Sequence, residues 1–413
     1  MKEKKRKVPK LRFPGFTDDW EQRELGEVVV EVTRNNGDSA APIMMITAND
    51  GFINQSNRYS TNNAGQSLKK YILLKKGELA YNHGASKLRP YGSCFALTTV
   101  KEVRIPFVYH CFATKTENPE FLAFILNGNT VERQLRKIVS SGARMDGLLN
   151  ISFKDYVLIP IMLPKREEQD VIVDYFNHID NLITLHQRKL EHLQLKKKAL
   201  LQKLFPKKGE KYPELRFPGF TESWEKYKLI DIATTFIGLV TTMTKNYKDK
   251  GILLIRNSDI RDNQFKFSDK PIYLDEEFAE KNKSRKLKIG DVVTVHTGDI
   301  GTSSVVTKKE EGAIGFATIN TRVDAKILNP QFLATYFNTI QHKKYAIRMS
   351  TGDGRLNYNM KDFNKLELIV PNLAEQVKIA NLIKIMNQNI SLQQRKIEHL
   401  QLQKKALLQQ MFV

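Results

Sequence analysis

Two long stretches of the chain place apolar residues at alternating spacings of four and three. The first stretch, residues 168–205, contains no proline or glycine. This spacing is a heptad pattern, which is typical of long helices that pair along an apolar seam. The seam positions are Ile172, Phe176, Ile179, Ile183, Leu190 and Leu193 in the first stretch, and Ile379, Ile383, Met386, Ile390, Ile397 and Leu400 in the second.

Polar residues interrupt each seam at the same two positions of the repeat. They are His186 and Lys197 in the first stretch, and Gln393 and Lys404 in the second. Such residues fix the register of paired helices at some cost in stability. A helix of roughly 38 residues is ~57 Å long and cannot bury its own apolar stripe. We therefore expect the two helices to pair, with antiparallel pairing as the hypothesis. Parallel pairing, or pairing with another subunit, stays open.

The segments outside these helices predict two compact domains of mixed helix and strand. In the first domain, residues 95–100 and 156–163 have the composition of strands, and residues 118–139 predict one helix, or two broken at Gly128. In the second, residues 329–349 predict a helix. The predicted fold class is α/β (α+β): two mixed α/β domains joined by two long antiparallel coiled-coil helices, with a pseudo-two-fold internal repeat. The predicted divisions are 1–162, 163–206, 207–369 and 370–413.

The repeat is explicit at the ends of each half. "LRFPGFTDDWE" at 11–21 returns as "LRFPGFTESWE" at 215–225, with nine of eleven residues identical. "QRKLEHLQLKKKALLQKLF" at 187–205 returns as "QRKIEHLQLQKKALLQQMF" at 394–412, with fifteen of nineteen identical. The segments between have diverged, although short echoes such as "NPEFLA" and "NPQFLA" survive. We interpret the shared ends as a structural frame that has the same role in both halves, and the interiors as two domains with different functions.

Composition and charge restrict the class of protein. The chain has 413 residues, 41% of them hydrophobic, which suffices for two or three globular domains. We find no apolar run of bilayer-spanning length and expect a soluble, cytoplasmic protein without a membrane partner. Two cysteines, Cys94 and Cys111, exclude a disulfide framework. The formal charge of +21 predicts a polyanionic partner, and nucleic acid is the first candidate.

The sequence contains no complete catalytic or metal-binding motif. "NPEF" and "NPQF" lack the second proline of an adenine-methyltransferase motif and are better explained as helix starts. No P-loop and no Cys/His metal cluster occurs. The acidic stretch 274–283 has the residue types of a nuclease site, but a solvated charged loop is the better explanation. We therefore expect no catalytic residue, no metal site and no cofactor in this chain.

Polar loops that contain glycine recur at matching places in both halves and are the candidate DNA-binding segments. Arg and Asn read base edges, and hydroxyl groups bind phosphates. Ordinary turn chemistry is the competing explanation. The candidate residues are Asn82, His83, Ser86, Lys87, Arg89 and Arg144 in the first half, and His296, Thr297, Ser303, Ser304, Arg355, Asn357 and Tyr358 in the second.

Taken together, the motifs resemble those of specificity subunits of type I restriction–modification systems. The resemblance covers the whole chain: "PKLRFPGFTDDW" and "PELRFPGFTESW" precede the variable segments, and "REEQ" and "AEQ" lead into the two helices. It implies that each variable domain is a target recognition domain that reads one half of a split double-stranded DNA sequence. It also implies that the helices are an antiparallel spacer that docks two modification subunits, as in the family, together with restriction subunits.

The resemblance assigns catalysis to those partners. S-adenosylmethionine, ATP and magnesium are expected there, and this chain is expected to be non-catalytic. Because the interiors differ, we expect two unlike half-sites, one to two duplex turns apart. One departure is that the chain ends one residue after the last shared phenylalanine, so that we expect no tail beyond the second helix. A stand-alone nuclease with duplicated recognition domains and an RNA-binding scaffold are the alternative hypotheses.

Overall fold

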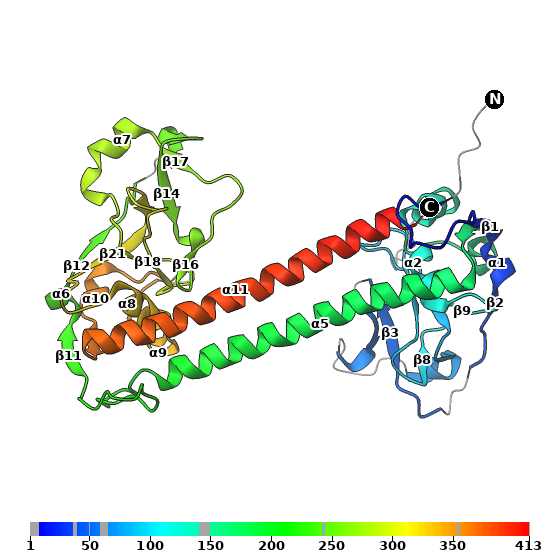
Figure 1. Ribbon diagram of the computed structural model, residues 1–413, viewed down its shortest axis with the longest axis horizontal. Helices are drawn as coiled ribbons and strands as arrows, with labels where there is room; N and C mark the ends of the chain where they lie inside the picture. The colour runs from blue at the N-terminus through cyan, green and yellow to red at the C-terminus, as the bar shows by residue number, and fades with distance from the viewer. Residues whose placement is uncertain are drawn as a thin grey trace. The chain divides into compact units, whose positions relative to one another are not determined.

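The chain forms two compact units that each combine a globular domain with parts of both long helices (Figure 1). The computed structural model describes residues 8–35, 39–48, 50–57, 65–139, 149–241, 244–352 and 356–412. Unit 1 comprises Met1–Leu185 and Lys396–Val413, and unit 2 comprises His186–Arg395. The boundary passes through the middle of each long helix. The four predicted segments are consecutive in the sequence, whereas each of these units combines residues from both halves of the chain. The four-segment division therefore stays a prediction.

Unit 1 is built on a four-stranded antiparallel sheet of order β2–β9–β6–β7. The pairs β1–β10, β3–β4 and β5–β8 form three smaller antiparallel sheets. The elements are β1 (Glu21–Glu24), α1 (Leu25–Val28), β2 (Val29–Glu31), β3 (Met44–Thr47), β4 (Gly51–Asn54), β5 (Ile72–Lys75), β6 (Leu79–Asn82), β7 (Ser93–Ala96), β8 (Glu102–Ile105), β9 (His110–Thr114), α2 (Pro119–Leu126), α3 (Asn129–Ile138), α4 (Phe153–Tyr156), β10 (Pro160–Leu163) and α5 (Arg166–Lys203).

Unit 2 repeats this plan with a sheet of order β12–β21–β18–β19. It adds a second four-stranded sheet, β13–β17–β14–β20, and the pair β15–β16. The elements are β11 (Glu225–Lys228), α6 (Leu229–Ile232), β12 (Ala233–Ile237), β13 (Tyr247–Lys248), β14 (Ile252–Arg256), β15 (Ile260–Arg261), β16 (Gln264–Phe265), β17 (Tyr273–Leu274), α7 (Glu276–Lys281), β18 (Val292–Val295), β19 (Ser303–Val305), β20 (Ile314–Phe316), β21 (Thr318–Val323), α8 (Pro330–Phe337), α9 (Ile340–Met349), α10 (Met360–Phe363), β22 (Glu367–Val370) and α11 (Leu373–Gln410).

The Asn-Pro dipeptides open equivalent helices, as the sequence predicts. The Asn118 side chain accepts hydrogen bonds from the first backbone N–H groups of α2, and Asn329 caps α8 in the same way. Proline follows at the first helical position, where its missing N–H costs nothing. Gly128 separates α2 from α3, which confirms the predicted break. Residues 329–349 form two helices, whereas one was predicted, because Thr339 caps a new helix start.

The predicted strand over 156–163 is partly wrong. Residues Phe153–Tyr156 form helix α4, because Ser152 accepts a hydrogen bond from the backbone N–H of Asp155 and starts a helical turn. The strand begins only at Pro160, which pairs with Glu24 in a two-stranded sheet. A proline at a strand start on a sheet edge agrees with its lack of an N–H donor.

The two "LRFPGF" segments are tied to the starts of the long helices by buried ion pairs. Arg12 donates two hydrogen bonds of 2.7 Å each to Glu168 of α5, whose side chain is 1% exposed. Arg216 repeats the contact with Glu375 of α11 at 2.8 Å. Each segment also reaches the end of the other helix, because Leu11 N–H donates to the Gln410 carbonyl and Leu215 N–H donates to the Lys203 carbonyl.

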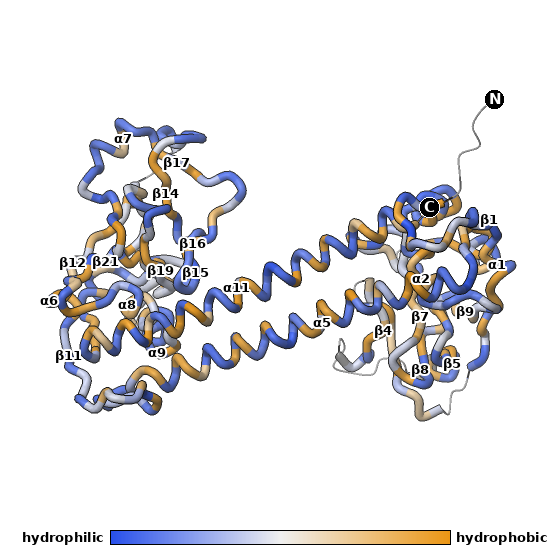
Figure 2. Tube along the Cα trace, in the orientation of Figure 1, coloured by the Kyte–Doolittle hydropathy of each residue, from blue (hydrophilic) through white to orange (hydrophobic). Residues whose placement is uncertain are grey.

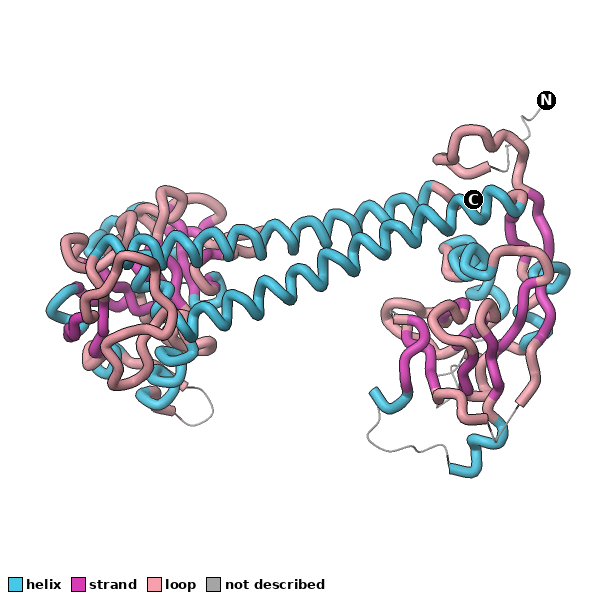
Figure 3. The backbone as a smooth tube through the Cα atoms, turned by 60° about the horizontal axis from the view of Figure 1, so that its bottom comes forward, coloured by secondary structure: helices cyan, strands magenta, loops and turns pink. Residues whose placement is uncertain are grey.

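The long helices run antiparallel within each unit. In unit 1, Phe176 of α5 packs against Phe412 just beyond α11, and further along α5 Asp180 accepts from Lys404 at 2.7 Å. In unit 2, the predicted polar seam residues His186 and Gln393 lie 2.7 Å apart. Figure 2 shows apolar positions returning along both helices, and Figure 3 shows both as continuous helices. All twelve predicted seam residues are buried or half-buried.

Equivalent aromatic clusters bind each helix end to its neighbouring domain. In unit 1, Phe412 contacts the rings of Trp20, Phe121 and Phe124. In unit 2, Phe205 contacts Trp224 and Phe332 in the same arrangement. Both tryptophans are 2% exposed. The shared residues of the two ends are therefore explained by one repeated packing scheme.

Candidate nucleic-acid interface

In each unit, the predicted DNA-binding loop that follows a strand of the central sheet is joined to a segment far away in the sequence, at equivalent places. The loop after β6 begins at His83, and the loop after β18 begins at His296. The His83 carbonyl accepts from the backbone N–H of Leu149 at 2.9 Å, and the His296 carbonyl accepts from that of Tyr358 at 3.0 Å. The same backbone bond thus joins the loop after the strand to the segment before α4 or α10. Two loops far apart in sequence are held together in each unit.

In unit 1 the loop between β6 and β7 is a braced hairpin. Ser86 N–H donates to the Arg89 carbonyl, and Arg89 N–H donates to the Ser86 hydroxyl, both at 3.0 Å. The Arg89 guanidinium donates to the carbonyl of Asn127 at 2.8 Å, and burial lowers the pKa of Arg89. Asn82 is also engaged, since its amide donates to the Ile46 carbonyl. Asn82 and Arg89 therefore support the loop, while Ser86 and Lys87 are exposed on it.

His83, the first residue of this loop, is 8% exposed. Its two ring nitrogens contact the carbonyl oxygens of Leu149 at 3.0 Å and Val108 at 2.7 Å. A neutral imidazole can donate to only one of them. The ring of His110 lies 5.0 Å away, and burial, followed by the charge of His83, lowers the pKa of His110 to about 4. His83 thus fixes the loop and is not presented to a partner.

In unit 2 a short chain of side chains crosses between the two loops. His296 Nδ1 lies 2.8 Å from the Thr297 hydroxyl, which donates to Asn357 Oδ1 at 2.8 Å. Burial lowers the pKa of His296, which favours its neutral form. Asn357 is exposed and is held by backbone hydrogen bonds to Thr351. Thr297 and Asn357 therefore present a polar edge whose geometry is fixed in advance.

Besides His83, three predicted contact residues are buried in this structure, and we correct the assignment of all four. Ser303, Ser304 and Tyr358 are 0%, 1% and 0% exposed. The serines belong to the central sheet, because β19 (Ser303–Val305) begins before the predicted loop ends and Asn338 holds the backbone of Ser303. Tyr358 lies in the core of unit 2. Arg144 and Arg355 fall outside the described residues.

Sequence reasoning missed the asparagines that anchor these loops. Asn338 exchanges two hydrogen bonds with the backbone of Ser303, and Asn127 does the same with Cys94. Asn257 accepts from the backbone N–H of His296. A signal existed for the first two, because each lies nine residues after its Asn-Pro helix start. Asn257 has no such counterpart in the repeat.

The acidic stretch 274–283 contains the whole of helix α7 (Glu276–Lys281), whereas a solvated charged loop was the favoured explanation. Asp275 caps α7, and Glu277 pairs with Lys281 one turn later at 2.8 Å. In the part of the chain that the structure describes, no group of three or more His, Cys, Asp or Glu side chains is placed to hold a metal ion. Among the same residues, no helix has the length and apolar character needed to cross a bilayer.

Comparison with known proteins gives consistent similarities. A family model described as "Type I restriction modification DNA specificity domain" matches residues 17–195 and again 221–402. The type I restriction enzyme MjaVIII specificity subunit of Methanocaldococcus jannaschii is 22% identical over 278 residues, which span 65% of this chain and 65% of that relative. The putative MjaX specificity subunit of the same organism is 22% identical over 435 residues, covering 98% of this chain and 95% of the relative.

Two solved structures share the fold over nearly the full length. One is a type I restriction-modification S subunit from M. genitalium, with a TM-score of 0.59 at 12% identity, covering 98% of this chain and 99% of that one. The other comes from a study of complex assembly and conformational transition of the type I R-M system, with a TM-score of 0.55 at 17% identity, covering 97% and 98%.

Proposed function

Because the chain belongs to the family of type I restriction modification DNA specificity domains, we propose that it is the DNA-reading subunit of a type I restriction–modification complex. Each globular domain reads one half of a split double-stranded target. The chain itself is non-catalytic. The long helices dock the modification and restriction subunits.

One observation carries this proposal: two domains share the same scaffold and present different loops at the same position. The backbone bond from Leu149 to His83 matches the bond from Tyr358 to His296, yet the exposed side chains nearby differ. Lys87 and Ser86 are exposed in unit 1, while Thr297 and Asn357 form the polar edge in unit 2. Different polar groups at equivalent sites support two unlike half-sites.

The partner chemistry is part of the same proposal. Methyltransferase subunits, two per complex, carry S-adenosylmethionine and methylate adenine, and restriction subunits use ATP and magnesium. The strongly basic composition supports attraction to the phosphate backbone of DNA. The paired helices offer the repeated surface that two identical subunits require, since a pseudo-two-fold repeat presents similar faces twice.

A domain exchange tests the proposal. Residues 20–160 are replaced by the equivalent segment of a relative with a different target, and methylated motifs are mapped in cells that contain the chain and its methyltransferase. We expect one half of the bipartite motif to change and the other half to persist. A continuous or palindromic motif, or a change in both halves, would contradict the proposal.

The alternative functions give different results with the purified chain. A nuclease would cut DNA in magnesium without any partner, and an RNA-binding scaffold would prefer single strands. We expect neither, and we expect binding to duplex DNA that weakens as salt increases.

A further inference from the structure

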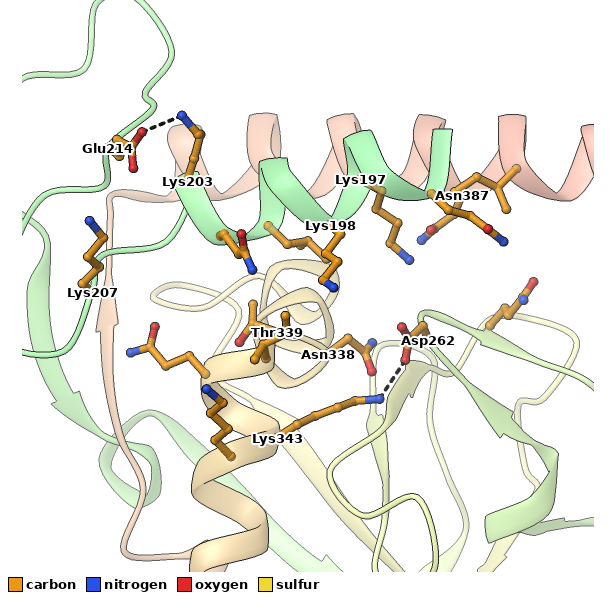
Figure 4. A pocket seen from close by; sticks show the side chains of 18 of the residues that line it. Lys197, Lys198, Lys203, Lys207, Glu214, Asp262, Asn338, Thr339, Lys343 and Asn387 are labelled. Carbon is orange, nitrogen blue, oxygen red and sulfur yellow. Dashed lines mark hydrogen bonds and ion pairs between the residues drawn. The ribbon is translucent and has the colours of Figure 1, made fainter. Parts of the chain in front are cut away.

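Unit 2 contains a strongly basic cavity that the proposed recognition of bases does not use. Its volume is about 980 Å³, and it lies between α5, α11, the start of α9 and the turn between β15 and β16. Among the described residues, seven lysines and two carboxylates line it, and none of the lining residues is aromatic. Figure 4 shows these side chains converging from several elements.

The two carboxylates neutralise only two of the lysines. Lys203 pairs with Glu214 at 2.6 Å, and Lys343 pairs with Asp262 at 3.3 Å. Within the described parts of the chain, five lining lysines form no ion pair: Lys197, Lys198, Lys207, Lys208 and Lys344. Five positive charges around one cavity repel one another, and an anion inside it would relieve that repulsion.

Unit 1 provides an internal comparison, because α5 and α11 are related by an offset of 207 residues. In unit 1, Lys404 is neutralised by Asp180, with both carboxylate oxygens at 2.7 Å. The equivalent of Lys404 in unit 2 is Lys197, and the equivalent of Asp180 is Asn387. The substitution replaces a carboxylate with a neutral amide, so that the lysine loses its counter-charge.

The consequence is visible at the Asn387 side chain. Its Nδ2 group is buried and lacks a hydrogen-bond partner in the structure. Burial also lowers the pKa of the adjacent Lys197; the charge of Asp262 opposes this shift, and the charge of Lys343 adds to it. Figure 4 shows Lys197 extending from α5 into the cavity beside Asn387 of α11. In unit 2 the Lys197 ammonium and the Asn387 amide are therefore both donors at the place where, in unit 1, the Asp180 carboxylate accepts from Lys404.

Helix α9 makes the same cavity more positive. Thr339 and Ile340, at its N-terminal end, line the cavity, and the N-terminus of a helix carries a partial positive charge. Lys343 in α9 corresponds to Glu132 in α3, so unit 1 has an acid at the position where unit 2 has a base. Lys343 also lies 3.6 Å from Asp299 in the loop after β18, which connects the cavity to the recognition loop.

We propose that the cavity of unit 2 binds phosphate groups, with one phosphate between Lys197 and Asn387 in the place that the Asp180 carboxylate occupies in unit 1. A phosphate ligand fits better than a carboxylate because five unpaired lysines require several negative charges. A phosphate chain fits better than a nucleobase because the cavity offers no aromatic ring for stacking. The site stands independently of which bases the loops read.

The test uses the full chain and inorganic tripolyphosphate, with binding measured by calorimetry. Asn387→Asp supplies the carboxylate that unit 1 contains, and we expect the affinity to fall at least tenfold. Lys197→Gln should have a similar effect by removing a donor. Asn389→Asp is the matched control, because it adds the same charge to an exposed position of α11 outside the cavity, and it should bind as the wild type does.

A second arm identifies the source of the phosphate. If the duplex backbone supplies it, tripolyphosphate competes with DNA, and Asn387→Asp lowers the slope of log affinity against log salt by about one. If a free polyphosphate supplies it, Asn387→Asp leaves DNA binding unchanged. Both results support the site. Wild-type affinity for tripolyphosphate in Asn387→Asp, or equally tight binding of an oligoglutamate peptide, would overturn it. A chain that binds tripolyphosphate but no DNA contradicts only the proposed function.

Discussion

Arg12 and Glu168 are 156 residues apart in the chain and form a two-pronged ion pair, with both hydrogen bonds at 2.7 Å. The same pair recurs as Arg216 and Glu375. In both pairs the arginine side chain is 14% exposed and the glutamate 1%. A fork-to-fork geometry with a buried carboxylate explains why arginine, and not lysine, occupies the "LRFPGF" segment.

Removing this arginine should destabilise its own unit. Arg12→Ala leaves the buried carboxylate of Glu168 without a counter-charge, and we expect a loss of about 3 kcal/mol in the free energy of unfolding. The chain has two tryptophans, one in each unit, so fluorescence during urea unfolding can report on one unit at a time. In a Trp224→Phe background, Trp20 reports on unit 1.

Lys165→Ala is the comparison variant, because Lys165 and Asp18 form an ion pair in the same unit with side chains 75% and 63% exposed. We expect that variant to unfold at the urea concentration of the wild type, since exposed pairs contribute little. Equal effects of Arg12→Ala and Lys165→Ala would show that the buried ion pair contributes no more to the free energy of unfolding than the exposed pair does.

Two isoleucines of α11 test the packing of the paired helices. Ile383 is 0% exposed and Ile385 is 55% exposed. We expect Ile383→Ala to cost about 2–5 kcal/mol, because it leaves a cavity in the core of unit 2. Ile385→Ala removes the same atoms from a surface position and should change stability by less than about 0.5 kcal/mol. Urea unfolding in a Trp20→Phe background measures both, and similar losses would disprove the assigned packing.

The frame could be predicted from the sequence because its signals are local and repeated. Heptad spacing identified both long helices, which begin at Arg166 and Leu373. Gly128 marked a helix boundary by its lack of a side chain. The strand predicted over 156–163 was placed too early, because the Ser152 cap starts a helical turn that includes Tyr156 and the strand begins only at Pro160. Caps act through geometry that composition does not reveal.

The starts of the loops after β6 and β18 were located correctly in the sequence, but the direction of each side chain could not be predicted. Ser303 and Ser304 have the same composition signal as Ser86, yet they are buried in β19 while Ser86 is exposed. Burial depends on where the turn ends, and that is set by distant contacts such as the one from Asn338 to Ser303. Whether the exposed candidates contact DNA stays a prediction.

The exposed loop residues should differ in how they affect DNA binding. Lys87→Ala removes a point charge, and we expect it to weaken binding to all sequences and reduce the salt slope by about one. Asn357→Ala removes the acceptor for the Thr297 hydroxyl and should relax the motif in one half-site only. Methylation mapping and binding at several salt concentrations distinguish these effects. Ser304→Ala, at a buried position, should change neither, and an altered motif in that variant would return Ser304 to the interface.

Acid should destabilise unit 2 through His342. The residue is 0% exposed, its Nδ1 lies 2.8 Å from the Phe337 carbonyl, and burial lowers its pKa to about 4. The unfolded chain takes up a proton below its ordinary pKa of about 6.5, whereas the folded chain does so only near 4. The stabilising contribution is therefore complete above pH 6.5 and is lost as the pH falls toward 4, by up to about 3 kcal/mol.

His342→Gln should flatten this part of the stability profile even if it lowers stability at every pH. Urea unfolding between pH 7 and pH 4.5 in a Trp20→Phe background gives the slope for each protein. Parallel profiles of the parent and His342→Gln would mean that another group governs the acid response.

The hydrogen bond from Leu11 to Gln410 matches the hydrogen bond from Leu215 to Lys203. Lys203 and Leu215 are close in the sequence, whereas Leu11 and Gln410 lie near opposite ends of the chain. Neither half of the polypeptide can complete its own unit, because each borrows a helix end from the other half. A gene that encoded a single half would therefore yield a working protein only as a homodimer, with two identical readers and a palindromic target. In the single chain the two domains have separate sequences, so that a substitution in one need not appear in the other.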